Sequence, residues 1–441
     1  MTKHLILFAA LTVLVNNVRA DTFTFGNETI DIELVIIDAP QNVPDLSRTA
    51  NPAYAGSIPY TFEIAKHEVT EAAFDVVAAV AGFDGEHKVA GPDKPVMVNW
   101  LQAAQFVNLL NTSQGFEPAY KFVEGTFSAW SSDDEGFDPG NSFRNRGAAY
   151  VLPDVDEWYK SAYFDSESTS YFRYTTGSNQ PPKPVEDGTT PGTAVCNAFP
   201  LEPEPRGPAD VFAAGGLSPY GTMAQGGNAQ EWNETELDLV NDTLDTNWIV
   251  RGGSWNGDCN FADNRVLSSF ANQTSTAGFR VGKVTPAPFV RGDFDRDGVL
   301  GIADLEFLIA HAVIGSNSVR FAHDLDGNHM IESDDVKIWL HELFGTWLGD
   351  ANLDGEFNSS DLSLVLQAGE YEDELVNNSS WASGDWNGDG EFTTSDLILA
   401  FEDGGYEQGP RNAVVPVPEP GSLTLLMCGI VKLAAHRRRA N

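Results

Sequence analysis

The sequence predicts an α+β protein with a second, smaller helical part. Residues 22–286 mix short strand-like stretches, a few amphipathic helices and long irregular loops, which is typical of an α+β domain. Residues 290–405 repeat an aspartate-rich loop followed by a leucine-rich stretch, which predicts short helices. A chain of 441 residues is long enough for each part to build a core of its own.

Three stretches of the larger part carry helix signals. In "FEIAKHEVTEAAFDVV" a strand runs into a helix with Thr70 as its N-cap. "NWLQAAQFVNLLN" is amphipathic, with Leu101, Phe106, Leu109 and Leu110 on one side. "YVLPDVDEWYKSAYF" starts a third helix near Pro153.

The formal net charge of −38 excludes a nucleic-acid-binding role, because the chain could not neutralise phosphates. The N-terminus predicts export: Lys3 precedes an apolar run from Leu5 to Val15, and Ala20 offers a small residue for cleavage. We therefore expect residues 1–20 to be a signal peptide and the mature protein to work outside the cytoplasm.

Four loops after residue 290 share one spacing of oxygen-bearing side chains. An aspartate or asparagine stands at positions 1, 3 and 5, an apolar residue at position 8 and an aspartate at position 12. Calcium takes six to eight oxygen ligands, and this spacing folds them around one ion. Glycine fills position 6 in three loops, whereas the second loop has His329. The predicted ligands are Asp293, Asp295, Asp297 and Asp304; Asp324, Asp326, Asn328 and Asp335; Asp350, Asn352, Asp354 and Asp361; and Asp385, Asn387, Asp389 and Asp396.

These loops resemble dockerin repeats, which bind cohesin modules partly through polar residues at positions 10 and 11. Ser359-Ser360 and Thr394-Ser395 hold these positions in the third and fourth loops, but Ile302-Ala303 in the first does not fit. The resemblance implies a cohesin-like or other surface protein as partner. A calcium-stiffened stalk is the alternative that the sequence leaves open.

The C-terminal segment 416–441 combines Pro418-Glu419-Pro420, a short apolar run and Arg437-Arg438-Arg439. This order resembles a PEP-CTERM sorting signal, in which an exosortase recognises the triplet and removes the tail. A simple tail anchor is the alternative. Either reading places the protein at the cell surface or outside the cell, with the tail only transiently in the membrane if it is removed.

Six segments of the larger part, in order, resemble the formylglycine-generating enzyme family, also called sulfatase-modifying factor domains. They are "IAKHEVTEAAF", "PVMVNWLQAAQFVNLLN", "YVLPDVDEWYKSAY", "SPYGTMAQGGNAQEW", "VRGGSWNGDCNFADNR" and "AGFRVGK". The family implies an irregular α+β fold related to C-type lectins. It also implies a structural calcium on Gly227, Ala229 and Glu231, for which a core glutamate paired with an arginine is the alternative.

The same resemblance locates a copper site that this sequence lacks. Family enzymes hold copper(I) on two cysteines, two and seven residues past the aromatic of Gly-Gly-Ser-aromatic; here these places are Gly257 and Ala262. Cys259 matches neither, and one thiolate cannot make a two-sulfur site. Ser254, Trp255, Cys259 and Trp232 remain candidate pocket residues without an assigned catalytic role, and we do not expect copper.

These observations favour binding or assembly over catalysis. The lectin-related ancestry implies a peptide, glycan or protein ligand. Two alternatives stay open: an oxidoreductase with a non-standard metal site, and a scaffold component that docks through its calcium repeats. Whether Cys196 pairs with Cys259 is also open.

Overall fold

The computed structural model describes most of the chain in two compact units that divide between Val336 and Lys337. The described residues are 18–47, 49–82, 90–196, 207–244, 247–257, 268–270, 276–314, 323–328 and 330–411. Residues 1–17 of the predicted signal peptide and the whole predicted sorting tail lie outside these ranges. The division differs from the boundary expected near residue 290, because the first two aspartate loops belong to the first unit.

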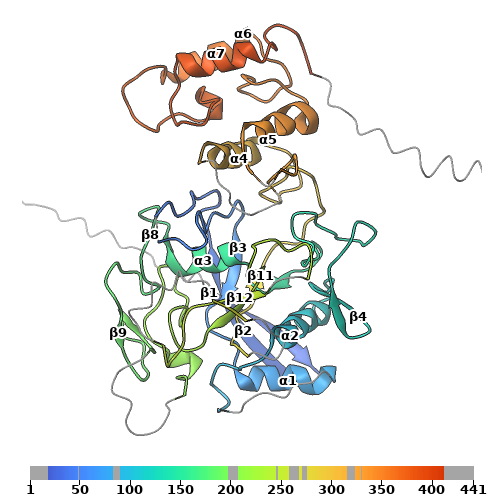
Figure 1. Cartoon of the computed structure of the whole chain (residues 1–441), viewed down its shortest axis with the longest axis vertical. Coiled ribbons are helices and arrows are strands. Elements are labelled where there is room, and N and C mark those ends of the chain that lie inside the picture. Colours follow the sequence, from blue (N-terminus) through green and yellow to red (C-terminus); the bar gives the residue numbers. More distant parts are fainter. Residues whose placement is uncertain are drawn as a thin grey trace, which may run out of the picture. The chain divides into compact units, whose positions relative to one another are not determined.

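A five-stranded antiparallel sheet organises the first unit (Figure 1). Its strands lie in the order β1 (Val18–Phe25), β2 (Glu28–Ile37), β3 (Phe62–Ala65), β14 (Gly282–Lys283) and β6 (Tyr150–Val151). Strand β14 pairs with β3 on one side and β6 on the other, so the end of the predicted domain closes against its beginning.

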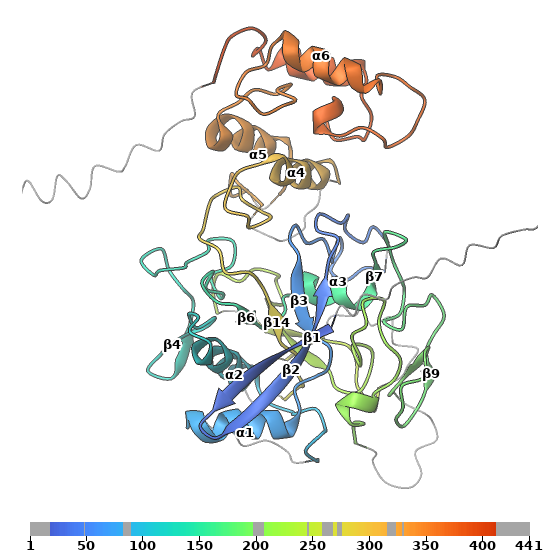
Figure 2. The ribbon, with the colours of Figure 1, turned by 180° about the vertical axis from the view of Figure 1, so that it is seen from behind.

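Helices α1 (Glu71–Ala81) and α2 (Trp100–Ser113) pack against this sheet beside β1 and β2, as Figure 2 shows from behind. The predicted N-cap is confirmed, since Thr70 Oγ1 accepts a hydrogen bond from the amide of Ala73 at 3.1 Å. Phe106 and Leu110 of the predicted apolar face are buried, whereas Leu101 and Leu109 are partly buried.

The third predicted helix is α3 (Val155–Tyr163), which is buried along its whole length. Asp154 caps it, with its side chain accepting from the amides of Asp156 and Glu157, so Pro153 lies just outside the helix. Because polar residues such as Lys160 are buried too, this helix must satisfy its side chains inside the protein.

Shorter elements complete the first unit. A second antiparallel sheet comprises β11 (Glu231–Glu236), β12 (Trp248–Arg251) and β13 (Ser268–Phe270). The small pairs are β4 (Lys121–Val123) with β5 (Thr126–Ser128), β7 (Phe164–Asp165) with β8 (Ser170–Tyr171), and β9 (Lys183–Pro184) with β10 (Thr193–Ala194). A 3-10 turn spans Val211–Ala213, and α4 (Ile302–Ile314) follows the first aspartate loop.

The helix that follows the second loop runs across the boundary between the units. It comprises α5 (Ser333–Ile338) and a π-helical turn, Trp339–Phe344. Among the described residues, no helix has the length and hydropathy needed to cross a membrane.

The second unit is built from two similar halves. Helix α6 (Ser359–Ala368) follows the third loop, and α7 (Thr394–Glu402) follows the fourth, after a 3-10 turn at Trp381–Ser383. Each half pairs with the other through equivalent residues: Phe357 bridges Tyr406, and Phe392 bridges Tyr371.

A glycine precedes each of these two loops for the same reason. Gly349 and Gly384 have φ of 99° and 115°, and a Cβ at either would collide with Phe357 or Phe392 of its own loop. In both halves the glycine backbone packs against the phenylalanine ring at position 8, so the two halves pack in the same way.

Candidate functional site

The four aspartate loops share one internal hydrogen-bond pattern. The aspartate at position 12 turns back into its loop and accepts from backbone amides: Asp304 accepts from Phe294 at 2.6 Å and from Gly301 at 2.9 Å. Asp335, Asp361 and Asp396 make the corresponding bonds in the other loops. The last predicted ligand is therefore held against the first residues of each loop.

The other predicted ligands are gathered by turns at positions 4 and 6. Arg296, Gly327, Leu353 and Gly388 at position 4 all have positive φ, as do the position-6 glycines Gly298, Gly355 and Gly390. The position-1 aspartate accepts from the position-6 amide in loops one, three and four, at 2.8–3.1 Å. His329, which holds position 6 in the second loop, lies outside the described residues.

Carboxylates converge in two of these loops closely enough to share one ion. Oxygen atoms of Asp293, Asp295 and Asp297 lie within 4.8 Å of one another, and so do those of Asp324, Asp326 and Asp335. Asp293 is 4% exposed, and its Oδ1 has no hydrogen-bond partner among the described residues. Hard oxygen ligands with an unsatisfied buried carboxylate oxygen are the donor set that calcium prefers.

Burial and mutual repulsion disfavour ionised carboxylates in these loops. Burial raises the pKa of Asp304 and of Asp385 to about 6, with neighbouring aspartates adding to the rise. The pKa values of Asp295, Asp335, Asp350 and Asp361 are also raised, chiefly by burial. A bound cation would reverse this balance, because its charge compensates both effects.

The other predicted calcium ligands, at Gly227, Ala229 and Glu231, are in a different environment. Glu231 is fully buried and accepts from Arg280 at 2.6 and 2.7 Å, while Trp158 Nε1 donates to it at 2.7 Å. This is the glutamate–arginine pair that the sequence left as an alternative. Since a guanidinium already compensates the Glu231 carboxylate, the arrangement does not favour calcium there, although the assignment remains a prediction.

A second carboxyl group lies close to this pair. Burial and the neighbouring Glu231 raise the pKa of Glu68. Glu68 accepts from Asn228 Nδ2 at 2.6 Å and from the amide of Ala229 at 2.9 Å. The amide of Ala229 thus donates to Glu68, so this segment satisfies buried carboxylates of the core.

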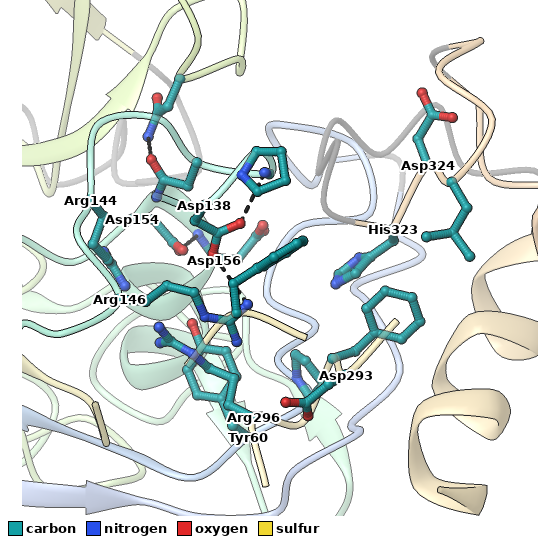
Figure 3. Close-up of a pocket in the computed structure, with 18 of the residues that line it drawn as sticks. Tyr60, Asp138, Arg144, Arg146, Asp154, Asp156, Asp293, Arg296, His323 and Asp324 are labelled. Carbon is teal, nitrogen blue, oxygen red and sulfur yellow. Dashed lines mark hydrogen bonds and ion pairs between the residues drawn. The ribbon is translucent and has the colours of Figure 1, made fainter. Parts of the chain in front are cut away.

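A cavity of about 410 Å³ lies in the first unit, where the first two aspartate loops meet residues 52–60 and 138–156 (Figure 3). Its lining combines arginines and aspartates with aromatic and proline side chains. Sequence reasoning missed this cavity, because its walls come from segments that are far apart in the chain and carry no shared motif.

One wall of the cavity is a buried charged network. Arg144 donates to both oxygens of Glu157 at 2.9 Å and to Glu234 Oε2 at 2.8 Å. Tyr60 donates its hydroxyl to Glu157 at 2.9 Å, and Tyr120 donates to Glu234 at 2.8 Å. Because both acids and the arginine are nearly fully buried, the bonds fix this wall in one arrangement.

Two further arginines of the cavity, Arg146 and Arg296, have little compensation from carboxylates among the described residues. Arg146 is 4% exposed, its closest described carboxylate is Asp138 at 3.6 Å, and its Nε has no partner among the described residues. Burial lowers the pKa of Arg146; Asp138 and Asp293 oppose this, and Arg296 adds to it. The charges of the two guanidinium groups therefore interact, and both residues line the cavity in Figure 3.

Residues 18–284 match the family model of the sulfatase-modifying factor enzyme 1-like domain, over more than half of the chain. The chain belongs to this family. The predicted α+β class and the family resemblance are confirmed, and we call residues 18–284 the sulfatase-modifying-factor domain below.

Solved structures similar to the chain include Treponema denticola variable protein 1 (19% identity, TM-score 0.42, covering 60% of this chain and 98% of that one). Others are CarF (20%, 0.41, 59% and 99%) and PvdO from Pseudomonas aeruginosa (14%, 0.39, 60% and 97%). No curated protein matches the chain in sequence.

The candidate pocket residues of the sulfatase-modifying-factor domain do not share one wall. Trp232 is buried in the main core and donates to Val98 O at 2.7 Å. Trp255 packs instead against Val195, Ala209 and Met223, and Ser254 Oγ bonds Asn256 at 2.6 Å. Cys259 lies outside the described residues.

Copper does not fit the residues at the family's two thiolate positions. Gly257 has no side chain, and its amide closes a turn onto Ser254 O at 2.9 Å. Alanine, which offers no ligand atom, holds the other position in the sequence. Cys196 is disulfide-bonded, so it offers no thiolate either.

His67 shows no sign of a metal-binding role. Its Nδ1 lies 2.9 Å from Val211 O, its Nε2 lies 3.6 Å from Glu33, and burial lowers its pKa to about 4. These contacts occupy both ring nitrogens, which supports a structural role for His67. His87 lies outside the part of the chain that the structure describes.

Proposed function

We propose that this chain is an exported, calcium-stabilised binding or assembly protein, in which the sulfatase-modifying-factor domain presents a ligand-binding surface and the aspartate loops dock a protein partner. The observation that carries the proposal is the common geometry of the four loops. Each holds its position-12 aspartate against its first backbone amides, in the spacing that surrounds a calcium ion.

Calcium would stabilise the folded loops because their acids repel one another without it. Asp293 contributes an unpartnered, buried oxygen to this cluster. Cation binding that relieves such repulsion adds directly to folding stability. The proposal includes all four loops, with the second as the weakest site because a glycine is absent from its position 6.

A calcium titration of the purified full chain tests this step. We expect three or four ions to bind by isothermal titration calorimetry, and Asp385→Asn to remove one of them. Asp238→Asn is the matched control, since Asp238 is exposed and, within the described ranges, accepts a hydrogen bond only from the amide of Val240. An unchanged ion count in Asp385→Asn, or no binding at all, would contradict the proposal.

The second unit offers a surface suited to a cohesin-like partner. Ser359, Ser360, Thr394 and Ser395, at positions 10 and 11, are all exposed. Apolar side chains on the same two helices are exposed as well, namely Leu364, Leu366, Ile398 and Phe401. Polar recognition residues beside an apolar patch support docking of a protein rather than a purely mechanical stalk.

The two halves of this surface can be tested separately. Ser359→Asp with Ser360→Asp, and Thr394→Asp with Ser395→Asp, change one half each while leaving the calcium ligands in place. Calorimetry against purified cohesin modules should show affinity lost in at least one double variant. If cohesin modules bind neither the parent protein nor any variant, cohesins are excluded as the partner.

Export and sorting complete the proposal. A signal peptidase would remove the N-terminal segment, and an exosortase would act at Pro418-Glu419-Pro420 and release the protein for the surface. A peptide, glycan or protein ligand is proposed for the sulfatase-modifying-factor domain. Formylglycine synthesis is not proposed, since Gly257 replaces a copper ligand.

A further inference from the structure

Two arginines from separate segments meet in the cavity of the first unit. Arg146 comes from the loop before β6, and Arg296 comes from position 4 of the first aspartate loop. Both arginines and Asp293 line the cavity drawn in Figure 3, and Arg146 interacts electrostatically with Arg296 and with Asp293. Two like charges at one cavity wall repel each other, and an anion bound between them would relieve this repulsion.

Aromatic rings hold both arginines in place without removing their charge. The Arg146 guanidinium lies 5.3 Å from the centre of the Phe289 ring, and that of Arg296 lies 5.3 Å from the centre of the Tyr60 ring. Among the described residues Arg296 makes no ion pair, and Arg146 has only the 3.6 Å pair with Asp138. Both groups can therefore donate to an additional acceptor.

The other carboxylates of the cavity already serve the backbone. Asp138 accepts from the amide of Gly140 at 2.9 Å, and Asp156 accepts from Gly56 at 2.8 Å. Asp154 caps α3. Asp324, a further lining acid, accepts from the amide of Gly327 at 2.7 Å. Asp293 also lines the cavity, and its Oδ1 has no hydrogen-bond partner among the described residues. Asp293 is also the first predicted ligand of the first aspartate loop.

We infer that this cavity binds an oxyanion (a carboxylate or sulfate group) attached to an apolar body, with Arg146 and Arg296 donating to the oxyanion, and that calcium in the first loop strengthens this binding. Pro52, Pro59 and Phe294 line the space that the apolar body would fill. A volume of about 410 Å³ is within the usual range for small-ligand sites.

The calcium dependence follows from the position of Asp293 and rests on the proposed calcium binding. Calcium would draw the Asp293 carboxylate into the loop and neutralise it, so Asp293 would no longer compete with the oxyanion for the two arginines. Calcium would also fix the turn that carries Arg296. By linkage, the oxyanion then strengthens calcium binding in the first loop by the same factor.

Phenyl sulfate is a suitable probe, because it joins a sulfate to an apolar ring. In calorimetry with the full chain in calcium, phenyl sulfate should bind, inorganic sulfate should bind more weakly, and benzyl alcohol should not bind. Arg146→Met and Arg296→Met should each weaken phenyl sulfate binding by about tenfold or more, the value of one charge-assisted hydrogen bond. Equal affinity for sulfate and phenyl sulfate would contradict the inference that the cavity binds an apolar body next to the oxyanion.

Arg173→Met is the matched control for the two arginine variants. Arg173 also lies over a tyrosine ring, 5.6 Å from the centre of Tyr174, but it is exposed and outside the cavity. Its substitution should leave phenyl sulfate binding unchanged. Arg296 is only partly buried, so its variant tests the site even if Arg146→Met fails to fold.

Two loop variants separate this inference from the calcium proposal. Asp293→Asn should remove one calcium ion and abolish the calcium dependence of phenyl sulfate binding, whereas Asp385→Asn should remove one ion and preserve it. Calcium binding without any phenyl sulfate binding would overturn the oxyanion site and leave the calcium proposal standing. Phenyl sulfate binding to a protein that binds no calcium would leave the oxyanion site standing and overturn the calcium proposal.

Discussion

Lys160 provides a sharp test of how buried charge limits the stability of the sulfatase-modifying-factor domain. It is fully buried in α3, its Nζ donates to Ala39 O at 2.7 Å, and burial lowers its pKa to about 7. Between the ordinary 10.5 and about 7 lie roughly 3.5 pKa units, which at 1.36 kcal/mol per unit correspond to about 5 kcal/mol of burial cost at low pH.

Lys160→Met removes this cost and keeps the length of the side chain. It also leaves the Ala39 carbonyl without its donor, which costs about 1–3 kcal/mol. We therefore expect the free energy of unfolding to rise by about 2–4 kcal/mol below pH 7, where the native lysine is charged in both states.

The pH dependence gives the decisive comparison. Between pH 7 and about 10.5 the unfolded state binds more protons than the folded state, so the native protein gains stability as the pH rises, and the variant should lack this gain. Urea unfolding at pH 6.5 and pH 9.5, in calcium, measures both. Lys121→Met is the control, because Lys121 pairs with Asp134 at 2.6 Å and its loss should not stabilise the protein. A Lys160→Met variant that is destabilised equally at both pH values would refute the reasoning.

Three further predictions concern acid stability, processing and catalysis. Because the folded-state pKa of His67 is about 4, stability should fall as the pH drops from 6.5 toward 4, and His67→Phe should flatten that loss in acid unfolding curves. Protein recovered from the cell surface should end near residue 420 by mass spectrometry; an intact arginine cluster at its end would favour a tail anchor. Incubation with copper and a cysteine-containing sulfatase peptide should yield no formylglycine; turnover that disappears in Cys259→Ser would restore the enzyme interpretation.

Local signals in the sequence located the regular elements well. Thr70 caps α1, and the amphipathic stretch after Asn99 forms α2, because a cap and its helix lie within a few residues of each other. The aspartate spacing likewise placed the loop turns, since each ligand is positioned by its neighbours in the same loop.

Contacts between residues far apart in the chain could not be predicted from these local sequence signals. Whether Glu231 faces a cation or Arg280 depends on β11 and the segment before β14, which meet only in the folded domain. The cavity is harder still, because Tyr60, Arg146 and Arg296 become neighbours through tertiary packing alone. The division of the aspartate loops between two units also depends on tertiary packing. The sequence repeat itself continues without a break from one unit to the next.

That division gives similar loops different structural support. The third and fourth loops belong to one small unit, where each pairs with the chain following the other's helix through Phe357, Tyr406, Tyr371 and Phe392. If calcium binds these loops as proposed, loss of either ion should disturb both loops, because each loop is bridged to the other half.

The first loop depends on the larger domain instead. The amide of Ala287 donates to Arg146 O at 3.2 Å, and Arg296 stacks on Tyr60, whose hydroxyl is tied to Glu157 in α3. Without calcium this loop should loosen while the domain beneath it stays folded, because the Arg144 network and the main core do not involve the ion. With calcium bound as proposed, the third and fourth loops would act as a cooperative pair, and the first loop would form a ligand-responsive edge of the cavity.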